Sequence, residues 1–142
     1  MQIPKPQISD KADNLCFACG QDNPIGLKLR FSEESGVIKG QFTPDKLHQG
    51  WSGVTHGGIL YTLLDEAGGY AVTHAGLNCV TAKSEVRFNS LAPVNEPLQI
   101  SAQITKTTSR LVETEATLSR QDGSIVAKNL SLWYIVGKAN ST

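Results

Sequence analysis

The stretch that decides the fold of this chain is His56-Gly57-Gly58-Ile59-Leu60-Tyr61-Thr62-Leu63-Leu64-Asp65-Glu66-Ala67-Gly68-Gly69. Apolar residues recur at helical spacing as far as His74, which predicts one long helix from His56 to about His74. The apolar face of this helix centres on Leu60 and Leu63. Gly76 follows at a position where glycine commonly ends a helix.

Segments that alternate like strands flank the expected helix. Residues 27–32 alternate apolar and polar side chains, and Ser35-Gly36 turns the chain into residues 37–42, which predicts a hairpin. Turns separate the strand-like segments that follow the helix, namely residues 80–88, 98–105, 111–118 and 125–136. The last of them places on one face Leu130, Leu132, Tyr134 and Val136. This order predicts an α+β domain in which one helix packs against an antiparallel sheet.

The expected helix carries more apolar surface than one sheet can cover. Tyr61 and Val72 lie away from its main apolar face. Because a sheet buries only one side of a helix, this surplus predicts a partner subunit, so we expect a homo-oligomer.

Length and charge exclude several classes of function. The chain has 142 residues, which predicts a single domain over residues 15–142 after an extended lead-in over residues 1–14. The 13 basic and 13 acidic residues cancel, so nucleic acid is not an expected partner. Apolar runs fall short of the roughly 20 residues that a membrane span needs. The polar N-terminus lacks the order of a signal peptide, which predicts a cytoplasmic location.

The two glycines that open the helix have two interpretations. The first backbone N–H groups of a helix have no partner in the helix, and with the helix dipole they suit an oxyanion such as a thioester carbonyl forms when it becomes tetrahedral. The structural alternative is that Gly57 and Gly58 only allow close packing of the backbone. The sequence leaves both open.

Asp65 stands in the interior of the helix, a position that Asp does not favour, and Gly68-Gly69 follow it at further cost to the helix. Such a cluster indicates a functional site or a tight helix crossing, whereas the simpler alternative is that Asp65 and Glu66 form a solvated face. Gly57 and Asp65 are eight residues apart, or about 12 Å along a helix. Groups that act on one carbonyl must lie within about 3 Å of it. If both act, they come from different subunits, for example from helices that run antiparallel across a two-fold axis.

The motif His56-Gly57-Gly58 followed by Asp65-Glu66 resembles the hotdog-fold acyl-CoA thioesterases related to the phenylacetyl-CoA and 4-hydroxybenzoyl-CoA enzymes. Within them it is similar to a subgroup that has Cys16-x-x-Cys19-Gly20, Asn23-Pro24-x-Gly26-Leu27 and Gln49-Gly50. The resemblance implies a curved antiparallel sheet of about five to six strands wrapped around one long central helix, in dimers or dimers of dimers with sites at the interface.

The resemblance also implies roles for individual residues. The Gly57 amide polarises the thioester carbonyl, Asp65 is the general base or nucleophile, and Thr81 helps to hold the attacking water. His56 orients the loop or meets the thioester, and Glu66 competes with Asp65 for the role of the acid. Where some relatives have an Asn six residues before the His, this chain has Gly50, so Gln49 or His48 would substitute.

Further residues are expected to bind the substrate, an acyl-CoA. They are Gly58, Gln49, Tyr61, Lys83 and Arg110. No cofactor and no metal are expected, because Cys16-x-x-Cys19 is only half of a tetrahedral zinc site and a packing role is favoured. A site shared between subunits and redox sensitivity stay open for these thiols.

These observations predict hydrolysis of an acyl- or aryl-CoA thioester to the free acid and CoA. One alternative is an acyl-thioester hydratase or dehydratase, an activity that also occurs on the hotdog fold. The other is a non-catalytic acyl-CoA-binding protein in which Asp65 serves only an interface.

Overall fold

The structure is a computed structural model that describes residues 13–138. Most of the lead-in predicted over residues 1–14 therefore lies outside the described residues, as do the last four residues of the predicted domain. Asp13 and Asn14, which are described, are exposed and belong to no helix or strand.

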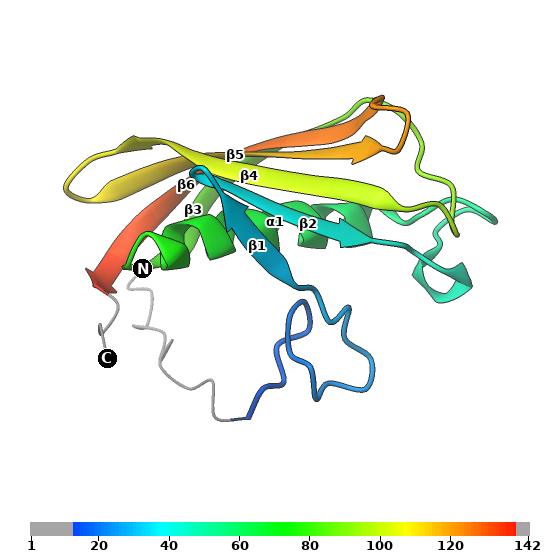
Figure 1. Ribbon diagram of the computed structural model, residues 1–142, viewed down its shortest axis with the longest axis horizontal. Coiled ribbons are helices and arrows are strands. Elements are labelled where there is room, and N and C mark those ends of the chain that lie inside the picture. Colours follow the sequence, from blue (N-terminus) through cyan, green and yellow to red (C-terminus); the bar gives the residue numbers. More distant parts are fainter. Residues whose placement is uncertain (1–12, 139–142) are drawn as a thin grey trace.

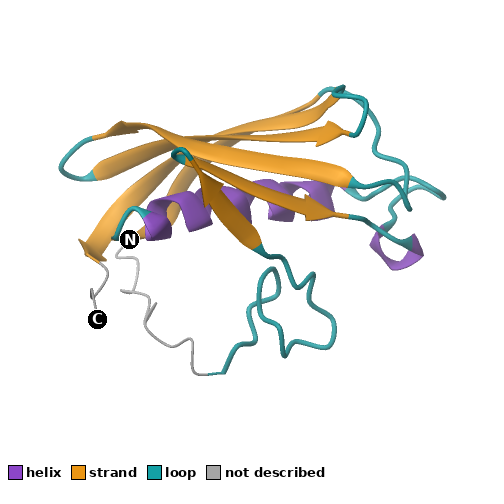
Figure 2. Cartoon of the chain, viewed as in Figure 1, coloured by secondary structure: helices purple, strands orange, loops and turns teal. Residues whose placement is uncertain are grey.

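One antiparallel sheet wraps around one long helix (Figures 1 and 2). The elements in chain order are β1 (Phe31–Glu34), β2 (Val37–Phe42), the short 3-10 helix η1 (Lys46–His48), α1 (Gly57–His74), β3 (Leu77–Phe88), β4 (Leu98–Thr107), β5 (Leu111–Arg120) and β6 (Ile125–Lys138). In the described chain the sheet has six strands in the order β1-β2-β4-β5-β6-β3, and every neighbouring pair is antiparallel. The predicted α+β fold is confirmed.

The core lies between the predicted apolar face of α1 and the concave face of the sheet. Leu63, Leu64 and Ala67 are fully buried on the helix side. They belong to one cluster with sheet residues that include Ile38, Leu98, Ile100, Leu118 and Val126. Each large side chain buried in this way contributes about 1.5–3 kcal/mol, so this contact fixes the position of the helix on the sheet.

Several predicted strand boundaries differ from the structure. The ends of β1, β4, β5 and β6 each lie two residues later than predicted, and the larger differences are at the starts of β1 and β3. Leu27 and Leu29 are buried as the alternation implies, but their backbone N–H groups donate to Phe17 and Ala18 of the preceding loop, so β1 begins only at Phe31. After the helix, β3 begins at Leu77 and not at residue 80, because its pairing with β6 continues to Lys138.

Of the two surplus apolar groups of the helix, Val72 is covered within the chain and Tyr61 is covered only in part, so Val72 gives no argument for a partner subunit. Val72 is buried against Val112 and Trp133 in a second small cluster. Tyr61 is half-buried, and its hydroxyl donates to Ser84 Oγ at 2.9 Å.

The apolar face predicted for the last strand is the outer face of the sheet. Leu130, Tyr134 and Val136 are exposed there. The inner face of β6 carries Asn129, Ser131 and Trp133, which are buried under the helix. Alternation therefore predicted which residues share a face, but it did not predict which face meets the helix.

Gly68 lies where the helix meets the indole of Trp133. A Cβ at Gly68 would stand 3.0 Å from Trp133 Cζ2 and 3.1 Å from Thr114 Oγ1. Neither neighbour can move easily, because Trp133 Nε1 donates to Thr114 Oγ1 at 2.8 Å and both residues are buried. The glycine after Asp65 thus serves the contact between the helix and its own sheet.

We expect Gly68→Ala to lower the free energy of unfolding by about 1–2 kcal/mol, since the overpacking outweighs the gain of roughly 1 kcal/mol in helix propensity. The matched control is Gly57→Ala, where the nearest atoms to a new Cβ are 3.8 Å away, in the Phe88 ring. Urea denaturation measures both variants. Equal or higher stability of Gly68→Ala would contradict the packing account.

Candidate active site

His56 caps the start of α1 with its side chain. Its Nδ1 accepts a hydrogen bond of 2.8 Å from the Gly58 N–H, and its carbonyl accepts from Ile59 and Leu60. Since Nδ1 accepts, the neutral ring carries its proton on Nε2. Gly57 is exposed, and within residues 13–138 its N–H has no hydrogen-bond acceptor. The helix therefore begins with one free backbone donor at the positive end of its dipole.

Packing explains one of the two glycines but not the other. A Cβ at Gly58 would lie 3.1 Å from His56 Nδ1, so the cap itself needs a glycine there. A Cβ at Gly57 would meet only the Phe88 ring at ordinary van der Waals distance. Nothing in the described chain requires Gly57 to be small, which leaves the approach of a ligand or of another subunit as the reason for its open surface.

A hollow of about 330 Å³ opens beside this free amide. Its lining consists of Gly50, Trp51, Thr55, His56 and Gly57. Trp51 lies at the edge of this hollow, and its side chain is 86% exposed, which is unusual for a large aromatic ring in a folded protein. A Cβ at Gly50 would lie 3.3 Å from the His56 ring, so glycine lets this loop pass close to the helix cap.

Asp65 is half-buried two turns further along the helix. Burial raises the pKa of its carboxyl group, and the neighbouring Thr81 and Tyr61 hydroxyls lower the pKa and offset part of this effect. The Thr81 hydroxyl donates to Asp65 Oδ1 at 3.2 Å. A carboxylate in this environment is a stronger base than an exposed one.

A β-bulge in β3 brings two hydroxyls to the helix side of the sheet. Residues three apart on a regular strand point to opposite faces. Thr81 and Ser84 nevertheless both contact the helix, at Asp65 and Tyr61, because the register of β3 against β6 shifts between Thr81 and Lys83. Thr81 was predicted through the resemblance, but its position beside Asp65 could not be derived from the sequence, because apolar alternation does not reveal a bulge.

A chain of buried polar groups continues from Tyr61, and the sequence analysis missed it. The Ser84 and Ser131 hydroxyls lie 2.7 Å apart, and Asn129 Nδ2 donates to Ser131 Oγ at 2.9 Å. Burying polar groups under a helix reduces stability unless the groups are hydrogen bonded. This series of hydrogen-bonded side chains holds the Tyr61 side chain beside Asp65. The available signal was the run of polar residues on the face of β6 opposite Leu130 and Tyr134.

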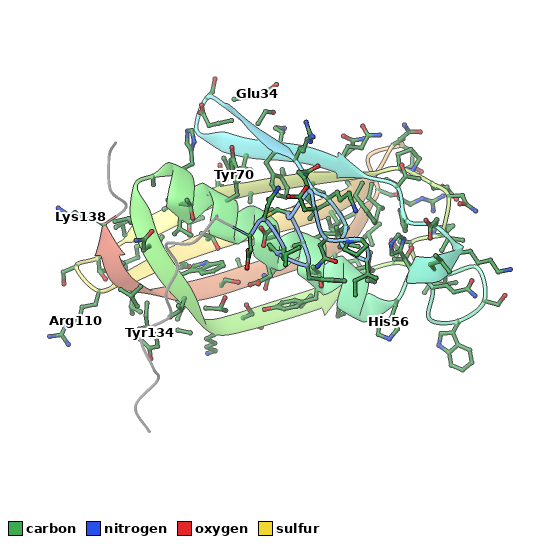
Figure 3. All side chains as sticks on the ribbon, turned by 90° about the horizontal axis from the view of Figure 1, so that it is seen from below. Glu34, His56, Tyr70, Arg110, Tyr134 and Lys138 are labelled. Atoms are coloured by element: carbon green, nitrogen blue, oxygen red, sulfur yellow. The ribbon has the colours of Figure 1, made fainter. Side chains whose placement is uncertain are left out.

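The helix keeps the two parts of the candidate site apart. Gly57 and Asp65 lie on one unbroken helix, so about 12 Å separates them along its axis. Figure 3 shows His56 at one end of the helix, with the rest of the helix leading away from it. One chain therefore brings Asp65, Thr81 and Tyr61 together, and it brings His56 and Gly57 together, but it does not unite the two groups.

Glu66 faces other surroundings than Asp65. Its Oε1 lies 4.0 Å from Cys16 Sγ. It also lines a separate cavity of about 570 Å³ together with Cys19, Phe31 and Tyr70. Consecutive helix residues point about 100° apart, so the two acids serve different places on the molecule.

Residues 52–127, more than half of the chain, match the thioesterase superfamily. This chain belongs to the thioesterase superfamily. The matched residues include Gly57, Asp65 and Thr81. One relative is a Saccharolobus solfataricus protein that is provisionally named an esterase. It is 28% identical over 120 residues, which cover 84% of this chain and 79% of that protein.

Solved structures of other proteins share the fold of this superfamily member. A hypothetical thioesterase protein from Streptococcus pneumoniae TIGR4, solved with coenzyme A, is 20% identical with a TM-score of 0.75 and covers 79% of this chain and 88% of that one. The same protein also matches, at a TM-score of 0.73, as two variants that replace an aspartate and a threonine by alanine. A Streptococcus mutans UA159 protein bound to acetyl CoA is 20% identical, has a TM-score of 0.75 and covers 79% of this chain and 91% of that one. The fold is the hotdog fold.

The remaining predicted residues lie apart from Asp65 in this thioesterase-superfamily chain. Gln49 Oε1 accepts from the Gly53 N–H within the loop before the helix. Lys83 lines a shallow hollow with Glu85, Glu113 and Leu130. Arg110 lies at the β4–β5 hairpin, at the opposite end of the molecule from His56 (Figure 3). His48 is less free to act in place of the Asn that some relatives carry, because its Nδ1 already accepts a hydrogen bond from the Asp45 N–H.

No helix in the described part of the chain is both long and apolar enough to span a membrane.

We expect Asp65→Asn to be at least as stable as the unchanged protein at neutral pH. Because the pKa of Asp65 is raised on folding, the free energy of unfolding falls as the pH rises through that pKa. The variant lacks this loss, so its stability relative to the unchanged protein should increase from acid to neutral pH. Thermal unfolding at a series of pH values measures the difference.

Asp122→Asn is the control of opposite sign. Hydrogen bonds from the Ser124 side chain and backbone lower the pKa of Asp122, so its contribution to stability is fully present above its ordinary pKa and is lost as the pH falls through the lowered pKa. This variant should lose stability toward neutral pH. If Asp65→Asn behaved like Asp122→Asn, the burial argument for Asp65 would be wrong.

Proposed function

We propose that this protein is an acyl-CoA thioesterase that hydrolyses an acyl- or aryl-CoA to the free acid and CoA at a site shared by two subunits. One observation carries the proposal. The chain presents a free, exposed Gly57 N–H at the start of α1 and a half-buried, hydrogen-bonded carboxylate, Asp65, two turns along the same helix. Thioester hydrolysis needs a hydrogen-bond donor for the oxyanion and a base or nucleophile.

In the proposed mechanism the Gly57 N–H of one subunit binds the carbonyl oxygen of the thioester. Asp65 of the partner subunit takes a proton from water as the water oxygen bonds to the carbonyl carbon. The negative charge that develops on the carbonyl oxygen is stabilised by the free N–H and by the helix dipole. When the tetrahedral intermediate collapses, the C–S bond breaks and the CoA sulfur receives the proton from Asp65. Asp65 as nucleophile is the variant of this mechanism that the geometry equally allows.

The surroundings of Asp65 suit a base. Burial raises its pKa toward the pH of the reaction, which makes proton removal from water more favourable. The Thr81 hydroxyl, which donates to Oδ1, fixes the orientation of the carboxylate and lies where it can also contact the water. His56 supports the other half of the site through its cap on Gly58 and presents Nε2–H beside the hollow at Gly57.

Similar proteins support this assignment. Coenzyme A and acetyl CoA occupy two of the solved structures that share the fold. In the Streptococcus pneumoniae protein, the threonine and the aspartate that were separately replaced are 16 residues apart, with the aspartate first. Thr81 follows Asp65 by the same 16 residues, and the two are hydrogen bonded. This shared separation supports Asp65 and Thr81 as one functional pair.

A hydratase or dehydratase fits the described residues less well. Such an enzyme needs an acid and a histidine on the same substrate. His56 is the histidine nearest the site, and its Nδ1 accepts the hydrogen bond of the helix cap, so its ring offers only the Nε2–H donor and no free base to a substrate. The proposed site also requires a homo-oligomer, either a dimer or a dimer of dimers. Lys83 and Arg110 of the second subunit are candidates for contacts with the nucleotide of CoA.

Release of free thiol from aromatic and aliphatic acyl-CoAs tests the proposal. We expect Asp65→Asn to lower kcat by about 10²–10⁴-fold. We expect Gly57→Pro to lower kcat by about 10²–10³-fold, since proline removes the N–H yet is tolerated at the first position of a helix. The preceding His56 already has φ −62° and ψ 136°, which a following proline accepts.

Two controls accompany this test. Gly57→Ala keeps the N–H and should lose far less activity than Gly57→Pro. Glu34→Gln removes an exposed carboxylate of β1 and should leave the activity unchanged. Saturable binding of acyl-CoA with no thiol release from any substrate would refute hydrolysis and favour the non-catalytic protein.

A further inference from the structure

Two thiols and a carboxylate meet on the side of α1 that faces away from the sheet. Cys16 and Cys19 belong to the loop before β1, which lies below the helix in Figure 1, and Glu66 belongs to α1. The two Sγ atoms and one carboxylate oxygen of Glu66 all lie within 4.8 Å of one another. The sequence alone favoured a packing role for Cys16-x-x-Cys19, because it offers only two ligands, and the fold adds Glu66, 50 residues after Cys16, as a third group.

The loop is folded so that both thiols point to the same place. The Gly20 N–H donates to the Cys16 carbonyl at 2.8 Å, and the Cys19 N–H donates to Cys16 Sγ at 3.4 Å. A Cβ at Gly20 would lie only 2.4 Å from the Cys16 backbone nitrogen, so the turn requires glycine. This turn brings the two sulfurs to the same side of the loop, next to Glu66.

The carboxylate of this cluster has no ion-pair partner among residues 13–138. The nearby Arg30 lines the same cavity as Cys19, but its guanidinium donates to Gln21 Oε1. A metal cation is therefore a suitable counter-charge for these three ligand groups.

We propose that Cys16, Cys19 and Glu66 bind one zinc ion. Thiolate and carboxylate oxygen are both zinc ligands, with bonds of about 2.3 Å and 2.0–2.2 Å, so ligand atoms of a tetrahedral site lie about 3.5–3.8 Å apart. The present separations, such as 4.0 Å from Cys16 Sγ to Glu66 Oε1, need shifts of less than about 1 Å. Cys16 is exposed, so a water molecule completes the coordination on that side.

The ion would fasten the loop before β1 to the middle of α1. The loop is otherwise anchored in the core by the buried side chains of Ala18, Leu27 and Leu29. Zinc displaces the thiol protons on binding, so its binding releases protons and couples to the folding of the loop.

The test uses the full-length protein, kept reduced and stripped of metal, with Co²⁺ and Zn²⁺ as probes. We expect thiolate-to-cobalt charge-transfer bands and tetrahedral visible bands with one Co²⁺ per chain, both abolished by one equivalent of Zn²⁺. Added zinc should also raise Tm. Absence of the charge-transfer bands in the unchanged protein, with its thiols shown to be free, would overturn the proposal without any variant.

Variants then assign the ligands. Cys16→Ser and Cys19→Ser should each lower zinc affinity by at least about 100-fold, and Glu66→Gln by about 10-fold or more. Cys79→Ser is the matched control, because Cys79 lines the same cavity as Cys19 but lies outside the cluster. Circular dichroism checks that each variant is folded. Loss of cobalt binding in Cys79→Ser, or unchanged affinity in folded Cys16→Ser and Cys19→Ser, would contradict the site.

Discussion

The constraint on which this account depends is the rigidity of one helix. A continuous α-helix rises 1.5 Å per residue, so Gly57 and Asp65 on α1 stay about 12 Å apart in any conformation that keeps the helix. A base and an oxyanion donor that act on one carbonyl must lie within about 3 Å of the reacting group. The helix therefore supplies both kinds of group and prevents a single chain from using them together. A second, antiparallel copy removes that conflict, which makes oligomerisation part of the proposed chemistry.

The sheet contacts this helix in two different ways, by tight packing near Gly68 and by polar contacts near Asp65. Near Gly68 the helix lies so close to Trp133 that it has no space for a Cβ, which holds the helix rigidly against the sheet. Near Asp65 a β-bulge and a chain of buried hydroxyls supply polar partners for a carboxylate whose pKa burial raises. A buried carboxylate reduces stability, and the tight packing nearby offsets that cost. The free donor at Gly57 lies outside this rigid region, at the exposed end of the helix.

Sequence reasoning predicted most of the fold, because helical spacing from His56 to His74 and alternation in the strands are local signals. It could not predict that the apolar face with Leu130 and Tyr134 points outward, since alternation does not say which face meets the helix. It assigned Val72 to the wrong surroundings, because Trp133 comes from a distant strand. Of the candidate site, the resemblance predicted His56, Gly57, Asp65 and Thr81, whereas the place of Ser84 under the helix depends on a bulge that leaves no sequence signal. The thiol and carboxylate cluster was missed because its third member is distant in sequence.

The most direct test of the central claim is subunit complementation between Asp65→Asn and Gly57→Pro, coexpressed with different tags so that hybrids can be purified. If the site joins Gly57 of one subunit to Asp65 of the other, each hybrid dimer has one intact site. A random mixture should then regain about a quarter of the activity of the unchanged protein, and the purified hybrid about half. If the hybrid is as inactive as either variant alone, the two residues do not form a site between subunits, and the account is wrong.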